Sequence, residues 1–184
     1  PSVDSLMHQS DEDAQKFLFT PLYTYQLGVT GIDSLFMFCQ KIIDFAKANG
    51  NKKLELQFEL FDVFNHPQQV TNNEALLATT KKIHQKAKDE NIKWAINVSK
   101  FYLALNYLTV QHDYPNGSLL LRETLDDIEK DNHFNSDLIR NPLLSALINY
   151  HYLMGDYQSV IFFGRQALKR ELNVNTALEK NAAA

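Results

Sequence analysis

The residues able to do acid–base, nucleophilic or metal chemistry are few in this sequence and widely separated. Six histidines are spread over 184 residues, and none pairs with another His or a Cys at metal-ligand spacing. Cys39 is the single cysteine, and no histidine stands near it in sequence to activate its thiol. The carboxylates of DDIEKD at 126–131 lack the alternating ligands and central glycine of a calcium loop. We therefore expect no catalytic set, no metal and no cofactor; an enzyme would need a metal or cofactor at His112, His151 or Cys39.

Two asparagines could do a different chemistry, which is hydrogen bonding to a peptide backbone. Asn106 and Asn149 stand in a pattern that occurs twice: an aliphatic residue, Asn and Tyr, five further residues, then Asp and Tyr. The two copies are offset by 43 positions. An Asn side chain carries an amide donor and a carbonyl acceptor, so it can pair with an extended peptide whatever that peptide's side chains. Two alternatives stay open: the amides form hydrogen bonds that fix the register of neighbouring repeats, or they have neither role.

Charge and hydropathy narrow the class of partner. The formal net charge is −4, whereas phosphate binding needs a concentrated excess of Lys and Arg, so we expect no nucleic-acid partner. No apolar run reaches the roughly 18 residues of a membrane-spanning helix, so we expect no membrane insertion in this fragment. The chain begins at Pro1 without a Met and ends in NAAA, which looks like vector-derived sequence after an excised fragment. Targeting segments are expected to be missing, which leaves a cytoplasmic and a periplasmic or other extracytoplasmic location open.

The elements that position the asparagines are expected to be helices. Gly and Pro number only 6 and 5, and between them apolar residues recur at intervals of three and four, the helical period. The breaks predict eight helical segments, at 12–27, 32–49, 52–65, 73–90, 92–112, 117–131, 138–154 and 156–171. Residues 1–172 are expected to form one helical repeat domain, with a loosely ordered tail at 173–184.

Several of these segments begin alike and at a nearly constant spacing. The starts are DSLFMF (33–38), EALLAT (74–79), GSLLLR (117–122) and QSVIFF (158–163), with offsets of 41, 43 and 41. A fixed period with helix–turn–helix content predicts a repeat protein in which neighbouring hairpins stack. Asp113 and Asp156 at the turns are expected to cap the next helix. Tyr114 and Tyr157 are expected to wedge between successive hairpins.

The last unit, 141–168, resembles a tetratricopeptide repeat. Leu144 precedes Leu147 by three, a Gly–Asp–Tyr turn follows at 155–157, and Ala167 with Leu168 closes the second helix. The unit at 98–125 is similar, with His–Asp–Tyr at the turn and with Phe101, Ala104, Leu105 and Leu108 at the packing positions. Gly164, where the family usually carries an aromatic residue, and the period of 41–43 depart from the family pattern. The resemblance implies an all-α, right-handed α-solenoid of about four helix–turn–helix repeats.

The resemblance also implies a function and a site. Arrays of this kind bind a peptide or protein in a concave groove, here as the sensing or docking part of a larger signalling or regulatory protein. The first helix of each hairpin lines that groove. Carried over to this chain, the groove residues are Ser99, Tyr102, Asn106, Thr109, Ser145, Asn149 and Tyr152.

An alternative function is self-association. In that interpretation the chain is a dimerisation scaffold of a multidomain protein. Exposed apolar residues of the terminal hairpins would form the dimer face, including Phe17, Phe19 and Tyr23 near the N-terminus.

Overall fold

The chain is helical throughout the part that the computed structural model describes, which is residues 32–65, 73–131, 133, 136 and 138–182. These ranges hold seven helices and no strand: α4 (Ile32–Ala48), α5 (Lys52–Asn65), α7 (Asn73–Asp89), α8 (Lys93–Thr109), α9 (Tyr114–Glu129), α11 (Arg140–Leu153) and α12 (Tyr157–Ala182). The predicted all-α class is thus confirmed for the described residues. The predicted segment at 12–27, with Phe17, Phe19 and Tyr23, lies outside them.

Helix α12 differs most from its prediction. The sequence placed its end at residue 171 and a loose tail from 173, but the helix continues to Ala182. The segment after residue 171 contains neither Gly nor Pro, so nothing in it stops a helix. The other six helices begin and end within three residues of their predicted limits.

The turns between helices are built from a recurring hydrogen-bonded end. Gly50, Asn91 and Gly155 adopt positive φ angles of 67°, 52° and 70°. In each case the next residue donates its backbone N–H to a carbonyl five positions earlier, at 2.9 Å. This 6→1 bond is the closure of a Schellman motif, and it satisfies a carbonyl that the end of a helix would leave unpaired.

The predicted capping role of the two turn aspartates is confirmed. Asp113 accepts a hydrogen bond from the backbone N–H of Asn116 at 3.3 Å, and Asp156 accepts one from Ser159 at 3.2 Å. The start of α9 is also earlier than predicted, because Asp113 is its N-cap and Pro115 fits within the first turn. Side-chain capping therefore fixes where both α9 and α12 begin.

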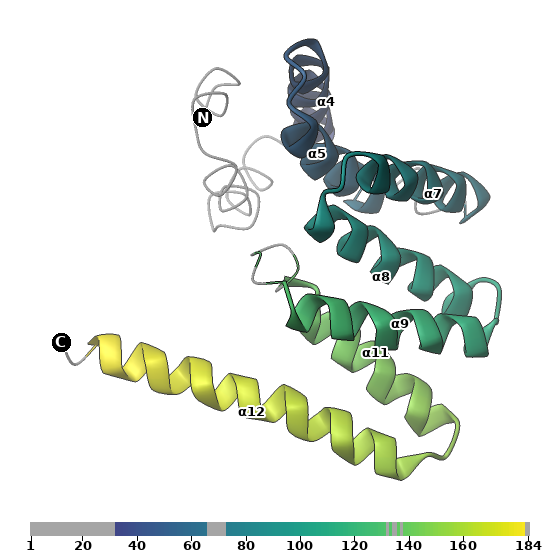
Figure 1. Ribbon diagram of the computed structural model, residues 1–184, viewed down its shortest axis with the longest axis vertical. Coiled ribbons are helices and arrows are strands. Elements are labelled where there is room, and N and C mark those ends of the chain that lie inside the picture. Colours follow the sequence, from purple (N-terminus) through teal and green to yellow (C-terminus); the bar gives the residue numbers. More distant parts are fainter. Residues whose placement is uncertain (1–31, 66–72, 132, 134–135, 137, 183–184) are drawn as a thin grey trace.

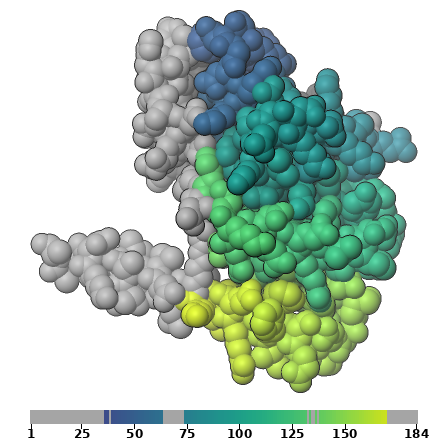
Figure 2. All heavy atoms as spheres, viewed as in Figure 1, coloured from purple at the N-terminus to yellow at the C-terminus, as the bar shows by residue number. Residues whose placement is uncertain are grey.

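Helices adjacent in sequence pack against each other from α4 to α12. The ribbon runs through them in chain order from one end of the molecule to the other (Figure 1). The space-filling view shows the same succession, with the segments from α4 to the start of α12 in direct contact (Figure 2). Such nearest-neighbour packing is compatible with a helical repeat.

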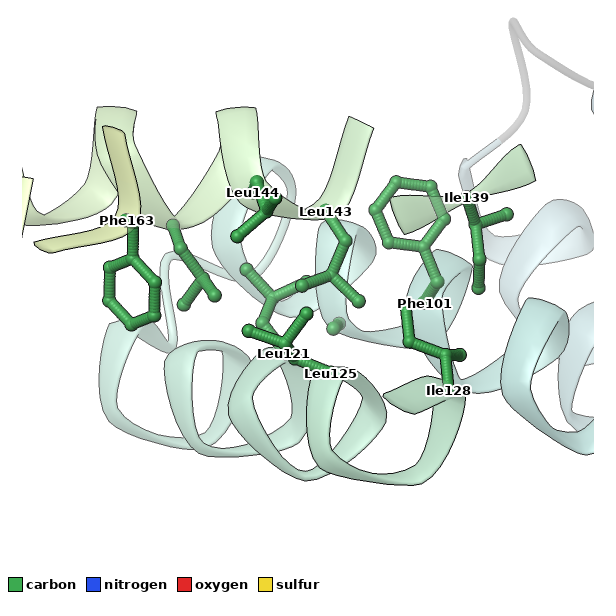
Figure 3. Close-up of a cluster of buried hydrophobic side chains, with 10 residues drawn as sticks. Phe101, Leu121, Leu125, Ile128, Ile139, Leu143, Leu144 and Phe163 are labelled. Carbon is green, nitrogen blue, oxygen red and sulfur yellow. The ribbon is translucent and has the colours of Figure 1, made fainter. Parts of the chain in front are cut away.

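Two apolar clusters hold the stack together. One joins α8, α9, α11 and α12, where the sequence-predicted packing residues Phe101, Ala104, Leu144 and Leu147 are buried and the eight labelled side chains interdigitate (Figure 3). The other joins α5, α7 and the start of α8, with Leu56, Ile83, Ala87, Trp94 and others. Helix α8 takes part in both clusters, so it is covered on more than one face. This position of α8 decides which of its side chains remain exposed.

Candidate functional site

An open apolar groove lies where the ends of α8 and α11 meet the start of α9. We call it the α8–α11 groove. Its volume is about 590 Å³, within the range of pockets that hold small ligands or side chains of a partner. Its lining residues are Leu105, Leu108, Thr109, His112, Tyr114, Ala146, Asn149, Tyr150, Leu153 and Met154.

The wall of the groove is aromatic. The Tyr114 and Tyr150 rings stack at 6.5 Å and 30°, and His112 contacts Tyr114 at a ring distance of 6.1 Å. The contact between Tyr114 and Tyr150 joins α9 to the next hairpin, as predicted for a wedging tyrosine. Because offset aromatic pairs hold a defined geometry, these rings form a fixed side of the groove.

The rim of the groove is apolar and accessible. Leu153 is 72% exposed and Met154 is 55% exposed at the end of α11. Large apolar side chains this exposed, next to a hollow, are a feature of interaction surfaces. A partner that covered them would remove apolar area from water, which stabilises a complex by about 25 cal/mol per Å² before the costs of association.

Two of the sequence-predicted site residues line this groove. Asn149 is exposed, and its amide has no side-chain hydrogen bond within the described part of the chain. Thr109 is also exposed, and its hydroxyl donates to the Leu105 carbonyl at 2.8 Å, which leaves the hydroxyl oxygen able to accept. The two polar groups therefore offer a donor and two acceptors beside apolar walls.

Two other predicted residues are buried, which corrects their placement on an open face. Ser99 is fully buried: its hydroxyl lies 2.9 Å from Nδ1 of His84 on α7 and donates to the Ala95 carbonyl at 2.6 Å. Asn106 is 8% exposed, and its carbonyl oxygen accepts from the Gln111 amide at 2.9 Å. That bond joins the last turn of α8 to Gln111 just after the helix, so the Asn106 oxygen is paired locally.

Ser99 and Asn106 are buried and not exposed as expected because α8 is packed between other helices. The sequence shows one apolar face on this helix, and the opposite face was expected to be open. Helix α7 packs on that opposite face, and the polar residue found there, Ser99, is accommodated through hydrogen bonds. A buried polar group costs little when it is paired.

The remaining three predicted residues lie outside the groove lining. Tyr102 is half-buried against the cluster that contains Phe101, and its burial raises the pKa of its phenol. Ser145 is exposed on α11. Tyr152 is 62% exposed and contacts Tyr157 at a ring distance of 6.2 Å.

The same contact corrects the wedging role predicted for Tyr157. Its ring is 61% exposed and touches Tyr152 of its own hairpin, because no described helix follows α12 to cover it.

The sequence did not identify most of the groove lining. Ala146, Leu153 and Met154 were not singled out, because nothing in their spacing separates an exposed apolar residue from a core residue. Tyr114 and Tyr150 carried a signal, since both belong to the repeated pattern, but only Tyr114 was assigned a role and that role was structural.

A buried histidine supports the hairpin that carries Asn149. His151 lies 2.8 Å through Nε2 from Arg122 on α9 and 2.9 Å through Nδ1 from Asp156. Arg122 can only donate, so Nε2 accepts and the proton of the neutral ring is on Nδ1, directed at Asp156. Hydrogen bonds from Ser159, with a further one from His151, hold the pKa of Asp156 below its ordinary value. The end of α11 is thereby tied to both α9 and the start of α12.

A second hollow, between α4, α5 and α7, has a different character. Its volume is about 770 Å³ and its lining is mostly charged. Glu55, only 2% exposed, lies 2.5 Å from Lys86 and 3.1 Å from Lys52. Burial opposes ionisation of Glu55, but hydrogen bonds from the two lysines outweigh it and hold its pKa below the ordinary value. Because Glu55 and Glu59 are paired with lysines of this lining, we interpret the hollow as a structural ion-pair network.

Within the described ranges, no group of three or more His, Cys, Asp or Glu side chains is placed to hold a metal ion. None of the seven described helices is long and apolar enough to span a bilayer.

Comparison with known proteins gives no relative: no protein-family model, no curated protein and no solved structure matches the chain.

Proposed function

We propose that this chain is a non-enzymatic protein-binding domain and that the α8–α11 groove receives an apolar segment of a partner protein. The observation that carries the proposal is the open hollow of about 590 Å³ whose rim residues Leu153 and Met154 are largely exposed. An apolar side chain of a partner can enter the hollow while the rim covers the segment that bears it. A few residues that fill well-packed pockets, often aromatic ones, carry most of the energy of a protein interface.

The lining indicates the chemistry of the segment. Among the groove residues His112 is the single basic residue, and none carries a carboxylate. A charged side chain would lose hydration there without a partner, so the favoured segment has Leu, Met or aromatic anchors. The flexible side chain of Met154 can adjust to anchors of different shape. In this proposal Asn149 pairs with the backbone of the same segment.

We also propose that the helices form a tetratricopeptide-like, right-handed α-solenoid of about four hairpins with a period of 41–43 residues. The sequential packing of helices and the recurring turn geometry support this interpretation. In it, the domain is the sensing or docking part of a larger signalling or regulatory protein.

The test begins with short displayed peptides selected on the intact chain, and it uses those peptides as the probe. Leu153→Asp and Met154→Asp each place a carboxylate on the groove rim at an exposed position, so the fold should be retained. Either change should weaken peptide binding by at least about tenfold, because a carboxylate facing apolar anchors costs more than about 1.4 kcal/mol. Leu119→Asp is the matched control, since Leu119 is 56% exposed on α9 and does not line the groove.

Two asparagine variants separate ligand contact from structure. Asn149→Ala should weaken binding with little change in thermal stability, because its amide is exposed. Asn106→Ala should leave binding nearly unchanged and lower stability, since it removes the bond to Gln111. Peptides that bind the two rim variants as tightly as the unmodified chain would contradict a binding site in this groove.

A further inference from the structure

A glycine in the middle of α12 has no explanation within the described chain. Glycine in a helix interior costs about 1 kcal/mol relative to alanine, so a reason for it is expected. At Gly164 an added Cβ would meet no described atom within 4 Å. At Gly117, by contrast, an added Cβ would lie 2.6 Å from Leu108, so packing within the chain accounts for that glycine. The open space over Gly164 instead permits another backbone to approach from outside.

Large apolar residues line the same face as Gly164. Tyr157, Ile161 and Leu168 follow the spacing of four, three and four that places them with Gly164 along one side of a helix. They are 61%, 49% and 62% exposed. We call these four residues the α12 stripe. A different side of α12 carries Phe163, which is buried in the core (Figure 3), so the large side chains of the stripe point away from that core.

We propose that the α12 stripe binds the α12 stripe of a second copy of this chain, with the two helices antiparallel and crossing at Gly164. The stripe is nearly symmetric about that residue, since Ile161 lies three positions before it and Leu168 four after it. Under a two-fold axis at the crossing, Ile161 of each copy therefore faces Leu168 of the other. This self-complementarity is what an interface between identical subunits requires.

The size of the stripe sets the strength of the association. At these exposures each large side chain leaves roughly 100 Å² accessible, given side-chain areas of about 150–250 Å². With the neighbouring Tyr152 and the flanking polar residues, pairing covers on the order of 1,000 Å² in total, the low end for specific interfaces. The pair is therefore a reversible dimer that forms at micromolar or higher concentration, not a permanent one.

The charges beside the stripe distinguish a second copy from another partner. Arg165 and Lys169 are exposed along one flank, and no acidic side chain accompanies them between Tyr157 and Lys169. In an antiparallel pair, equivalent flanks meet, so these positive charges repel and salt should strengthen association by screening them. An acidic helix of a different protein would bind more weakly as salt increases.

The test measures the mass of the intact chain by sedimentation from about 1 μM to about 1 mM, at low and high salt. We expect a monomer–dimer equilibrium that salt shifts toward dimer. Gly164→Leu fills the crossing point and should abolish the dimer, yet raise the melting temperature of the monomer by about 2–4 °C because Leu favours helix. Ile161→Asp should abolish the dimer as well. Leu119→Asp is the control at a similarly exposed site and should leave the equilibrium unchanged.

A second measurement is cross-linking through an introduced cysteine, and Cys39 does not have to be replaced for it. Cys39 is the single cysteine and is fully buried, so Arg165→Cys introduces the one accessible thiol among the described residues. A short bismaleimide should link two copies of this variant, and Gly164→Leu should prevent the link. A monomer at all concentrations, a dimer that Gly164→Leu does not weaken, or a mass that grows beyond two copies would each overturn the proposal.

Discussion

The start of α9 is packed so closely on α8 that position 117 should not accept a side chain. A Cβ at Gly117 would lie 2.6 Å from Cγ and 2.7 Å from Cδ2 of Leu108, and 3.2 Å from the carbonyl oxygen of Ala104. Carbon atoms attract most strongly at about 3.5–4.0 Å. Gly117→Ala would thus require Leu108 to move by about 1 Å, or α9 to move away from α8.

Two opposing terms give the size of the effect. Replacing Gly by Ala within a helix favours folding by about 0.8–1 kcal/mol. Overpacking of a filled contact costs typically about 1–3 kcal/mol. The clash should win, because one of the crowded atoms belongs to the backbone and cannot rotate away. We expect a net loss of about 1 kcal/mol, which is a decrease of roughly 2–4 °C in melting temperature for a domain of this size.

A double-mutant cycle measured by urea unfolding isolates the contact. Leu108→Ala removes the side-chain atoms that Gly117→Ala would crowd, so the double variant should be more stable than the sum of the two single changes predicts, by about 1–2 kcal/mol. Gly164→Ala is the matched control, since a Cβ there meets no described atom within 4 Å. At concentrations where the chain is monomeric, the Gly164→Ala variant should have a free energy of unfolding about 1 kcal/mol higher than the unmodified chain.

Two results would refute this account of the α8–α9 contact. One is a Gly117→Ala variant that is as stabilised as Gly164→Ala. The other is a cycle that is additive within about 0.5 kcal/mol. Because Leu108 also lines the α8–α11 groove, Gly117→Ala should in addition weaken binding of groove-selected peptides.

Three further predictions concern single side chains. Burial, with smaller contributions from Lys88 and Lys100, lowers the pKa of His84 to about 4. As the pH falls, the unfolded chain therefore binds the proton before the folded chain does. The free energy of unfolding should decrease as the pH drops from about 6.5 toward 4. A full shift corresponds to about 3 kcal/mol of folding free energy, which falls to about 1–2 kcal/mol because water reaches part of the ring. His84→Gln should lose this part of the urea-unfolding pH profile. Burial, and then the charge of Asp62, raises the pKa of the Cys39 thiol from 9.0 to about 12. Because the thiolate is the reactive form, Cys39 in the folded chain should react with a disulfide reagent at pH 8 about a thousandfold more slowly than an ordinary thiol. The difference should disappear when the chain unfolds. His112 has a φ of 53°, which costs a residue with a Cβ roughly 1–2 kcal/mol, so His112→Gly should raise the melting temperature by a few degrees.

The order and limits of the helices could be predicted from sequence because their ends are encoded locally. Gly50, Asn91 and Gly155 adopt the left-handed conformation that Gly and Asn accept most easily. Asp113 and Asp156 cap the helices that follow them. The end of α12 was not predicted, because no Gly or Asn in the left-handed conformation and no capping Asp marks it in the sequence.

The faces of α8 could not be predicted, because a single sequence shows which residues are apolar but not how many neighbours a helix has. Leu144 and Leu147 were recognised as packing residues and are buried, since one apolar face sufficed on α11. Ser99 is equally buried, and one of the partners that make its burial acceptable is His84, fifteen positions earlier on α7. A hydrogen bond between distant residues leaves no periodic signal.

The groove depends even more on tertiary structure. Asn149 was found through the repeated pattern, whereas Leu153 and Met154 become rim residues only through the way α11 ends beside α8 and α9. An exposed apolar residue and a buried one have the same letter in the sequence. Their difference appears once the neighbouring helices are in place.

The most direct measurement of the central claim is an NMR titration of the intact chain with a groove-selected peptide. The account predicts that the amide signals that shift most belong to residues 105–114 at the end of α8 and to residues 146–154 of α11, with Asn149 among them. Shifts centred on the charged hollow between α5 and α7, or on the face of α9 that carries Leu119, would contradict it.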